Sequence, residues 1–422
     1  MTYDMITRFT CSNFKNVDVN QMSLGKVNLL IGPNNAGKSN FIRALSFAAN
    51  MTNTSNNETS GFLAEIRRNG SSEVIKHGAE NKKVHLSWRI LLTGQSMDYT
   101  LDFRMDTASK SFKIAKESLD SAEVIGNNNR PFNYFLFHDK KPGYGMFSTA
   151  YQMGRANKRI HVPALIDETG LRQFDKLVMK NEDLLNSLYV RGTMFTMLEE
   201  LRSYFLKFYS YGSSQFDFEK VRLLQEPTAK DSRLSKDGSN FLSVYRYAKT
   251  VDSDFEERFF NKMKELITDL EDIKVVEGLD KIGMKLFMCR SEYMLSEVSD
   301  GTIEALLLAL LTSLPKELAP TLLAIDEPEV NLHPAWQNVL AKWLQTCGGF
   351  SQCFISTHSS DFLDAFTDGF KNGLVNIFVY DSMNENTFKP LNRERVNAEL
   401  ENGWLLGDLY RVNDPVIGGW PW

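Results

Sequence analysis

The spacing of hydrophobic and polar positions changes several times along the chain, and each change marks a different kind of element. Residues 6–14 and the short apolar run 27–31 are expected to be strands, followed by a glycine-bearing loop and the helix SNFIRALSFAAN. The polar stretch MTNTSNNETSG is a loop by composition. Between residues 84 and 114, the alternation in KVHLSWRILL, DYTLDFRM and SFKIA predicts antiparallel strands.

From about residue 167 to residue 270 the period becomes helical, but the helices are too short and interrupted for the sustained heptads of a long coiled coil. After residue 297, helix and strand alternate in GTIEALLLALLTSL, TLLAID, PAWQNVLAKWLQ and CFIST, an order typical of a mostly parallel sheet. We therefore expect an α/β protein with a mixed sheet flanked by helices, an antiparallel β sub-domain and a helical insertion. The expected segments are 1–60, 61–150 (β-rich), 151–275 (mainly helical) and 276–422.

The composition limits the classes of protein to which this chain can belong. Hydrophobic residues make up 42% and charged residues 24% of the 422 residues, which is ordinary for a globular protein and argues against global disorder. The formal net charge of −5 does not favour nucleic-acid binding by the surface as a whole. Locally, Arg155, Lys158 and Arg159 in QMGRANKRI could line a DNA groove or form a solvated basic face.

Cysteine spacing and the N-terminal pattern indicate a reducing compartment. The four cysteines form no CxxC pair and no zinc-site spacing, so they are expected to be buried or free thiols. The N-terminus lacks the pattern of a signal peptide, and no apolar run approaches the ~18 residues of a membrane helix. We therefore expect a cytoplasmic protein with no membrane partner.

One motif predicts a phosphate-binding loop. The run GPNNAGKS fits G-x-x-x-x-G-K-[ST] at every fixed position, and it follows a buried strand and precedes a helix, as the motif requires. Glycines let backbone N–H groups curl around the β-phosphate, Lys38 would reach the β- and γ-phosphates, and the Ser39 hydroxyl would ligate Mg²⁺. The motif therefore predicts ATP and Mg²⁺ as ligands. The residues expected at the nucleotide are Gly32, Pro33, Asn34, Asn35, Ala36, Gly37, Lys38, Ser39 and Asn40.

Two further strand ends carry candidate catalytic groups. The strand TLLAID ends in Asp326, with Glu327 directly after it, which places two carboxylates at the edge where open α/β sheets bind ligands. Asp326 would hold the Mg²⁺ shell, and Glu327 would polarise the attacking water as general base. His358 follows another apolar strand and could either sense the γ-phosphate or have a structural role. Lys38, Glu327 and His358 form the expected catalytic set.

A third feature lies at the start of the helix GTIEALLLALL. Ser299, Asp300 and Gly301 stand at this helix N-terminus, where they could form a simple cap. The functional alternative is an anion site for a phosphate delivered from outside the subunit.

The order of these motifs closely resembles that of the ABC-type ATPases that include SMC, Rad50 and RecF. More narrowly, the chain resembles the AAA15 and OLD-like branch of that group through SNFKNV, KDGSNFLSV, VSDGTIEALLLALL, IDEPEVNLHP, STHSSDFLD and LGDLYRVNDPVIGG. The resemblance implies a P-loop NTPase head of the ABC type, formed by segments 1–60 and 276–422 together with the β-rich sub-domain. Gln152 is a candidate for the glutamine of the Q-loop.

In that family, the signature loop of one subunit completes the ATP site of the other. The resemblance therefore implies a head-to-tail dimer, or a higher oligomer, in which Ser299 and Gly301, with Asp300 between them, contact the γ-phosphate in trans. It also implies that Lys15 lies near the nucleotide. Asp300-Gly301-Thr302 replaces the Gly-Gly-Gln of the wider superfamily, which bears on the strength of the trans contact. The residues implied in a loop that crosses the dimer interface are Asn331 and His333.

The comparison with OLD nucleases, which carry a metal-dependent Toprim domain, suggests that the effector is a separate protein. Only about sixty residues follow His358, and Asp381-Ser-Met is not a D-x-D motif. We expect a hydrolysing sensor or scaffold that controls a nuclease or toxin in anti-phage defence, as in PARIS-, Septu- and retron-associated pairs. The alternatives are a RecF-like DNA-binding or DNA-repair ATPase and a non-hydrolysing scaffold held together by ATP, against which the intact Glu327 argues. The aromatic end with Trp420 and Trp422 could pack on the core or dock a partner.

Overall fold

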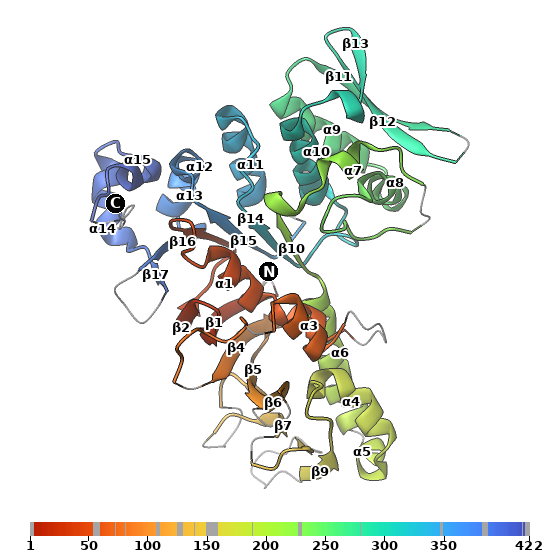
Figure 1. Cartoon of the computed structure of the whole chain (residues 1–422), viewed down its shortest axis with the longest axis vertical. Coiled ribbons are helices and arrows are strands. Elements are labelled where there is room, and N and C mark those ends of the chain that lie inside the picture. Colours follow the sequence, from red (N-terminus) through yellow and green to blue (C-terminus); the bar gives the residue numbers. More distant parts are fainter. Residues whose placement is uncertain are drawn as a thin grey trace. The chain divides into compact units, whose positions relative to one another are not determined.

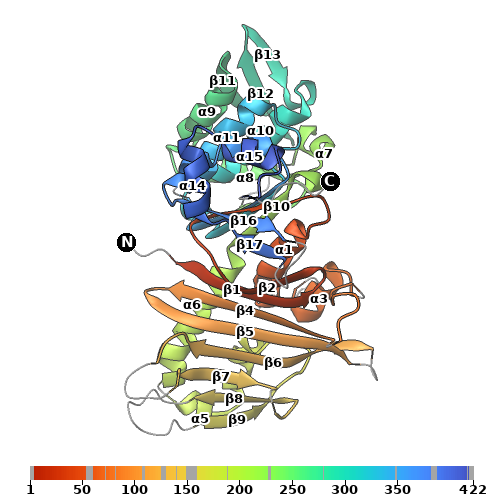
Figure 2. The same ribbon diagram turned by 90° about the vertical axis from the view of Figure 1, so that its left-hand side faces the viewer.

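Two compact units make up the chain, and each is built from segments that are distant in sequence. The first unit comprises Met1–Gly25, Asn34–Phe208 and Tyr380–Pro390, and the second comprises Lys26–Pro33, Tyr209–Val379 and Leu391–Trp422. Figures 1 and 2 show the two units in a computed structural model. The structure describes residues 4–53, 60–71, 73–80, 82–106, 110–124, 130–138, 140–148, 159–187, 189–226, 230–278, 280–346, 349–381, 387–415 and 417.

The first unit is organised around an antiparallel sheet with the strand order β2-β1-β4-β5-β6-β7-β8-β9 (Figure 2). In β4, every second residue is buried, which is the pattern of a strand with one face on a core. The antiparallel strands predicted between residues 84 and 114 are therefore confirmed. The strands are β1 (Met5–Phe14), β2 (Val17–Ser23), β4 (Lys83–Leu92), β5 (Gln95–Asp106), β6 (Ser111–Ser121), β7 (Asn133–Phe137), β8 (Tyr144–Ser148) and β9 (Arg159–Pro163).

Helices of the first unit cover one face of this sheet through aromatic contacts. The Trp88 indole of β4 donates a hydrogen bond to the carbonyl of Leu45 (2.9 Å) and packs edge-on against Phe205 at a ring distance of 5.9 Å. Phe9 of β1 contacts Phe41 in the same manner at 5.6 Å. The helices are α1 (Lys38–Leu45), α2 (Phe47–Met51), α3 (Phe62–Arg68), α4 (Gly170–Met179), α5 (Glu182–Asn186), the π-helix Val190–Met194 and α6 (Phe195–Leu206).

The second unit contains a sheet in which β10, β14, β15, β3 and β16 lie in that order. Strands β14, β15, β3 and β16 pair in parallel. All five residues of β3 are buried, as expected for a strand inside a parallel sheet. The bounds are β10 (Phe208–Gly212), β14 (Leu322–Asp326), β15 (Gln352–Thr357), β3 (Val27–Ile31) and β16 (Val375–Tyr380), while β17 (Phe388–Pro390) lies in a segment of the first unit.

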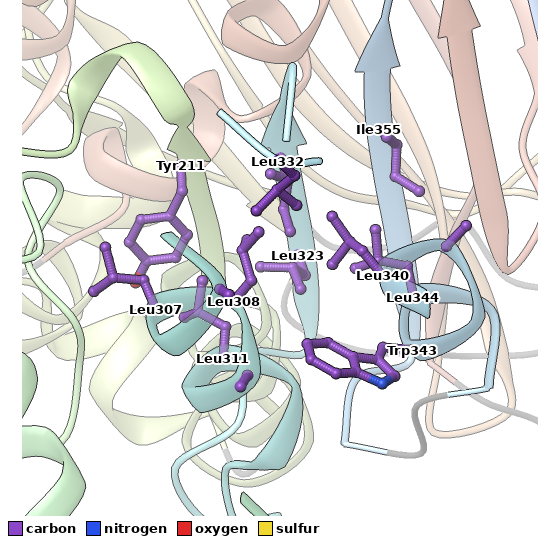
Figure 3. Packing of buried hydrophobic residues seen from close by; sticks show 14 of the residues in the cluster. Tyr211, Leu307, Leu308, Leu311, Leu323, Leu332, Leu340, Trp343, Leu344 and Ile355 are labelled. Atoms are coloured by element: carbon purple, nitrogen blue, oxygen red, sulfur yellow. The ribbon is translucent and has the colours of Figure 1, made fainter. Parts of the chain in front are cut away.

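Side chains of two helices converge on Leu323 of β14 in the core of the second unit (Figure 3). Leu307, Leu308 and Leu311 come from α10 (Asp300–Ser313), and Leu340, Trp343 and Leu344 come from α11 (Pro334–Thr346). With 14 residues, α10 is the longest helix in the described part of the chain, so no long coiled coil occurs there. The remaining helices are α7 (Phe218–Arg222), α8 (Phe241–Val251), α9 (Phe255–Leu266), α12 (Ser360–Asp364), α13 (Thr367–Lys371), α14 (Arg393–Glu401) and α15 (Leu406–Arg411).

Strands also occur where the periodicity predicts helix. The expectation of helix from residue 167 to residue 270 is wrong for Phe208–Gly212, because these residues form β10 beside β14. A separate three-stranded antiparallel sheet follows α9, with β11 (Leu270–Glu277), β12 (Ile282–Met288) and β13 (Ser291–Met294). None of the described helices is long and apolar enough to cross a membrane.

Candidate nucleotide site

Three adjacent parallel strands of the second unit end at one edge of the sheet. Asp326 of β14 lies opposite Ser356 of β15, and Thr357 of β15 lies opposite Ile31 of β3. Gly32 directly follows β3, and His358 directly follows β15. The start of the P-loop, the acidic strand end and the histidine therefore share the carboxyl edge of the sheet, where open α/β sheets bind ligands.

The Asp326 carboxylate is oriented by the neighbouring strand. Its Oδ1 atom accepts a hydrogen bond from the hydroxyl of Ser356, which faces it across β14 and β15. The same serine oxygen lies 3.2 Å from the backbone nitrogen of Glu327 and accepts from it. Asp326 thus presents a carboxylate of fixed orientation to the sheet edge.

Glu327 is held in a left-handed backbone conformation, with φ of 52°. Its N–H donates to the carbonyl of Ser356 (3.0 Å), and its carbonyl accepts from the hydroxyl of Ser213 (2.8 Å). The Oε1 atom lies 3.2 Å from Nδ1 of His358, and both side chains are about one-third exposed (31% and 38%). Glu327 and His358, which were predicted separately, are therefore in direct contact and partly exposed to solvent.

Two other glutamates of this region are almost fully buried. Burial raises the pKa of Glu329, and the nearby charge of Glu327 adds to the effect, while a hydrogen bond from Thr357 opposes it. Burial also raises the pKa of Glu304 in α10 to about 7, against the opposing influence of Ser213 and Asn331. Neither residue belongs to the predicted site.

The phosphate-binding loop continues into the first unit, where α1 begins at Lys38. Gly37 has φ of 95°, a conformation that favours glycine, and a Cβ atom there would lie 2.9 Å from Oδ1 of Asn16. Asn16 donates a hydrogen bond to the carbonyl of Asn35 (3.0 Å) and accepts one from the amide of Asn40 (2.8 Å). Asn16 therefore stabilises the conformation of the loop, although it lies outside the P-loop motif itself.

The structure places Lys38, Ser39 and Lys15 in the first unit. Lys38, at the start of α1, is buried to 4% exposure, and Ser39 is half-buried. Lys15 precedes Asn16 and lies within electrostatic reach of Arg43 of α1. Partial burial lowers the pKa of Lys15, and repulsion by Arg43 lowers it further, whereas Glu73 opposes both.

The signature residues stand at the N-terminus of α10. Ser299 is the N-cap, and its hydroxyl accepts a hydrogen bond from the N–H of Thr302 (3.3 Å). Arg222 donates to Oδ1 of Asp300 (2.5 Å) and to the carbonyl of Val298 (3.1 Å). Ser299 therefore caps α10, and Arg222 of α7 fixes the turn that precedes this cap.

Gly301 connects this turn to the loop after β14. A Cβ atom on Gly301 would lie 2.7 Å from the carbonyl oxygen of Asn331, so only glycine allows the two backbones to approach this closely. Asn331 and His333 are exposed, as is the side chain of Val330 at 54%. The structure thus brings the signature residues next to the predicted interface loop within one unit.

Several predicted features fall outside the described residues. These are Gln152, Arg155, Lys158, Trp420, Trp422 and Cys347. Arg159 lies exposed at the start of β9 in the first unit. Cys11 and Cys353 are buried and Cys289 is exposed, and none of these three described cysteines forms a disulfide.

The two predicted magnesium ligands are both oxygen donors, and each lies in a different unit. Among the residues that the structure describes, no three His, Cys, Asp or Glu side chains cluster into a metal site of their own. The predicted ligands are the Ser39 hydroxyl in the first unit and the Asp326 carboxylate in the second. Mg²⁺ prefers oxygen ligands and keeps several waters and phosphate oxygens in its shell, so each donor is of a type that it accepts.

The functional residues that the motifs missed are linked to the site by contacts between distant segments. Ser213 and Glu327, for example, are 114 positions apart. Glu329 and Asn16 do lie inside quoted motifs, IDEPEVNLHP and SNFKNV, so their position was visible although their contacts were not. The missed residues are Asn16, Ser213, Arg222, Glu304 and Glu329.

The parallel sheet, the P-loop and the acidic strand end define a P-loop NTPase fold of the ABC type. The chain belongs to the family described as "AAA domain, putative AbiEii toxin, Type IV TA system", whose model matches residues 27–153 and 206–364. Membership of this family implies nucleotide binding. No curated protein is similar enough in sequence to match the chain.

The chain is similar to solved structures of SMC heads, one of which is similar enough to show the fold. An SMC head bound to the C-winged helix domain of ScpA has a TM-score of 0.51 at 11% identity, with 94% of this chain and all of that chain covered. An SMC head from Pyrococcus furiosus bound to the C-terminal domain of ScpA has a TM-score of 0.49 at 13% identity, with 94% and 99% covered. The SMC head domain from Thermotoga maritima has a TM-score of 0.45 at 14% identity, with 92% and 99% covered. At these identities the first likeness shows the fold alone.

Proposed function

We propose that this chain is an ATP-hydrolysing ABC-type ATPase that works as a head-to-tail dimer and controls a separate effector protein. The observation that supports hydrolysis best is the contact between Glu327 and His358 at the carboxyl edge of β14 and β15, 3.2 Å apart and partly open to solvent. A carboxylate directly after the predicted Mg²⁺ ligand is the group needed to polarise an attacking water. Without Glu327, the chain would be expected to bind ATP but not to hydrolyse it.

Each predicted residue has a distinct part in this proposal. The N–H groups at the start of α1 and the Lys38 ammonium would bind the β- and γ-phosphates. Ser39 and Asp326 would hold Mg²⁺, which supplies charge neutralisation at the phosphates. Glu327 would accept the proton of the attacking water, and His358 would hydrogen-bond near the γ-phosphate.

A second subunit would complete the site through the signature turn. The Ser299 N-cap and the following helix N-terminus provide a preformed set of hydrogen-bond donors for a phosphate. The loop that carries the exposed residues Asn331 and His333 meets this turn at Asn331, which suits a loop that contacts the partner subunit. The proposal is therefore that each ATP is bound between the P-loop of one copy and the signature turn of the other.

Control of a separate effector is supported by two of the comparisons. The family is described by a putative toxin and a toxin–antitoxin system. The SMC head that shares this fold at a TM-score of 0.51 is bound to a domain of another protein, ScpA. We infer that the present chain also binds a partner protein, and that its nucleotide state controls this partner, a nuclease or toxin of an anti-phage system.

Two substitutions test hydrolysis by this site. Lys38→Ala should lose ATP binding because it removes the positive charge that meets the phosphates. Glu327→Gln should bind ATP but lower kcat by about 10²-fold or more, because the amide cannot accept the proton. Nucleotide binding and phosphate release are measured side by side. Equal turnover by wild type and Glu327→Gln would refute the assignment of the base.

The partner can be identified by affinity capture. Glu327→Gln protein is purified with ATP from cells that carry its native neighbouring genes, and bound material is analysed by protein mass spectrometry and nuclease-sensitive staining. A second protein in fixed stoichiometry supports the effector proposal. Nucleic acid without a protein partner would replace it with the RecF-like, DNA-binding alternative.

A further inference from the structure

A second glutamate lies two positions beyond the predicted base and is not explained by nucleotide chemistry. Glu329 follows Pro328 in the loop after β14, and its side chain is buried to 3% exposure. A buried carboxylate is costly unless its oxygens are matched by hydrogen-bond donors or by a functional need. The position of Glu329 therefore calls for a specific role.

One oxygen of Glu329 anchors the segment that carries His358. Its Oε1 atom accepts a hydrogen bond from the hydroxyl of Thr357 (2.5 Å) and lies 3.4 Å from the backbone nitrogen of His358. The Thr357 oxygen in turn accepts from the N–H of Ser359 (2.9 Å). The carboxylate thus organises the three residues that end β15 and turn towards α12.

The same oxygen faces the imidazole. Nδ1 of His358 lies 3.2 Å from Oε1 of Glu327 and 3.8 Å from Oε1 of Glu329. The same ring nitrogen therefore faces two carboxylates, one partly exposed and one buried. Movement of Glu329 would shift the backbone and the ring of His358 together.

The second oxygen of Glu329 shows that hydrogen bonding alone does not account for this acid. Its Oε2 atom is buried and has no hydrogen-bond partner among the described residues. A glutamine would be a weaker acceptor for Thr357 and would bury an N–H₂ group in place of this oxygen. A buried carboxyl group with one unpartnered oxygen is expected to have a function rather than to add stability.

We propose that Glu329 is a positioning residue, which fixes His358 through Thr357 and thereby holds the Glu327 carboxylate in the geometry for water activation. The proposal rests on the proposed function, since it assigns a role within ATP hydrolysis. Glu329 is not assigned contact with the reacting atoms, because its side chain is buried to 3% exposure. Its influence should appear in the chemical step and should leave ATP binding unchanged.

Three variants test this link. Glu329→Gln keeps the shape but weakens the acceptor that meets Thr357, Thr357→Val removes the donor, and Thr357→Ser keeps that donor. The matched control is Glu317→Gln, which changes an exposed glutamate of the same unit. The readouts are ATP binding, kcat, KM and melting temperature.

The expected result is a fall in kcat of about 10-fold for Glu329→Gln and for Thr357→Val, with KM within about twofold of wild type. Thr357→Ser and Glu317→Gln should keep kcat. If Thr357→Ser loses as much activity as Thr357→Val, the hydroxyl contact is not responsible and the proposal fails.

A double-mutant comparison separates positioning from a general packing effect. Each substitution is made in wild type and in a His358→Ala background. If Glu329 acts through His358, then Glu329→Gln should change kcat by less than about twofold once the imidazole is absent. An equal fall in both backgrounds would overturn the proposal, because it would show that Glu329 acts independently of His358.

The test distinguishes this inference from the underlying function. If wild type shows no ATP hydrolysis that depends on Lys38, the proposed function fails and this inference fails with it. If wild type hydrolyses ATP and Glu329→Gln matches it in kcat, the ATPase assignment survives and only the role of Glu329 is refuted.

Discussion

At the scale of single residues, the backbone of Glu327 is as informative as its side chain. A φ of 52° is uncommon for a residue with a Cβ atom and costs about 1–3 kcal/mol. The conformation persists because Ser356 holds the N–H and Ser213 holds the carbonyl. The surrounding structure therefore directs this carboxylate, and replacement of either serine should loosen it.

Glu117 shows how a buried carboxyl makes stability depend on pH. Burial raises its pKa to about 7, although the N–H groups of Gly170 and Leu171 and the hydroxyl of Tyr99 all donate to it. The folded state therefore keeps this proton up to about pH 7, whereas the unfolded chain loses it near the ordinary value of about 4.5. Since the folded state binds more protons in that window, stability is greatest below it and falls as pH rises through it.

The measurement is the free energy of unfolding from pH 4.5 to pH 8 for wild type and Glu117→Gln. The neutral side chain cannot ionise, so the variant should lack a loss of up to about 3 kcal/mol that wild type shows across this window. Glu80→Gln, which changes an exposed glutamate of the same unit, should keep the wild-type profile. Parallel profiles for wild type and Glu117→Gln would show that Glu117 titrates normally.

At the scale of elements, secondary structure is predicted best where one hydrophobic periodicity continues without interruption and a motif lies at its end. The strand 27–31 and the helices and strands from residue 300 to residue 357 are present as expected. The residues of β3 are all buried, and the helices bury apolar side chains in the core. The apolar pattern of the sequence therefore indicates each element directly. The P-loop motif and the acidic strand end were predicted because each directly follows such an apolar strand.

Elements that depend on a distant neighbour could not be predicted in this way. Strand β10 follows an amphipathic helix without a Gly or Pro break, and it becomes a strand by lying next to β14, over one hundred residues later. Contacts such as those of Asn16 with the P-loop and of Arg222 with Asp300 likewise join segments that have no common motif. The strand and these contacts depend on tertiary interactions, which cannot be predicted from the pattern of a single sequence.

The signature helix offers a prediction at this scale. Gly301→Ala should force Asn331 away from α10, because the new Cβ atom would lie 2.7 Å from its carbonyl oxygen. We expect ATP hydrolysis to fall about 10-fold or more while the melting temperature stays near wild type, since alanine favours helix over glycine by about 1 kcal/mol. Gly192→Ala, where a Cβ atom meets nothing within 4 Å, is the control and should hydrolyse ATP normally. Full activity of Gly301→Ala would show that the loop adapts without consequence.

At the scale of the whole molecule, the residues proposed to bind phosphate and those proposed to activate water belong to different units. Lys38 and Ser39 lie in the first unit, whereas Asp326, Glu327 and His358 lie in the second. The signature turn and the exposed loop beside it also lie in the second unit. A protein that hydrolyses ATP only between two copies would thus make activity depend on the encounter of subunits.

Mixing two inactive variants tests this dependence. Lys38→Ala removes the P-loop lysine, and Ser299→Arg places a large side chain at the signature turn. Neither homodimer should hydrolyse ATP, but a mixed dimer contains one site that joins the intact P-loop of one copy to the intact signature turn of the other. Random pairing at equal amounts should therefore restore about a quarter of wild-type activity, because half of the dimers are mixed and each carries one working site. Phosphate release is measured before and after mixing, over a range of protein concentrations, with each variant mixed with itself as the control. Activity that rises with the mixture and with concentration would establish composite sites, whereas activity no greater than that of the separate variants would mean that each copy uses its own signature turn or none.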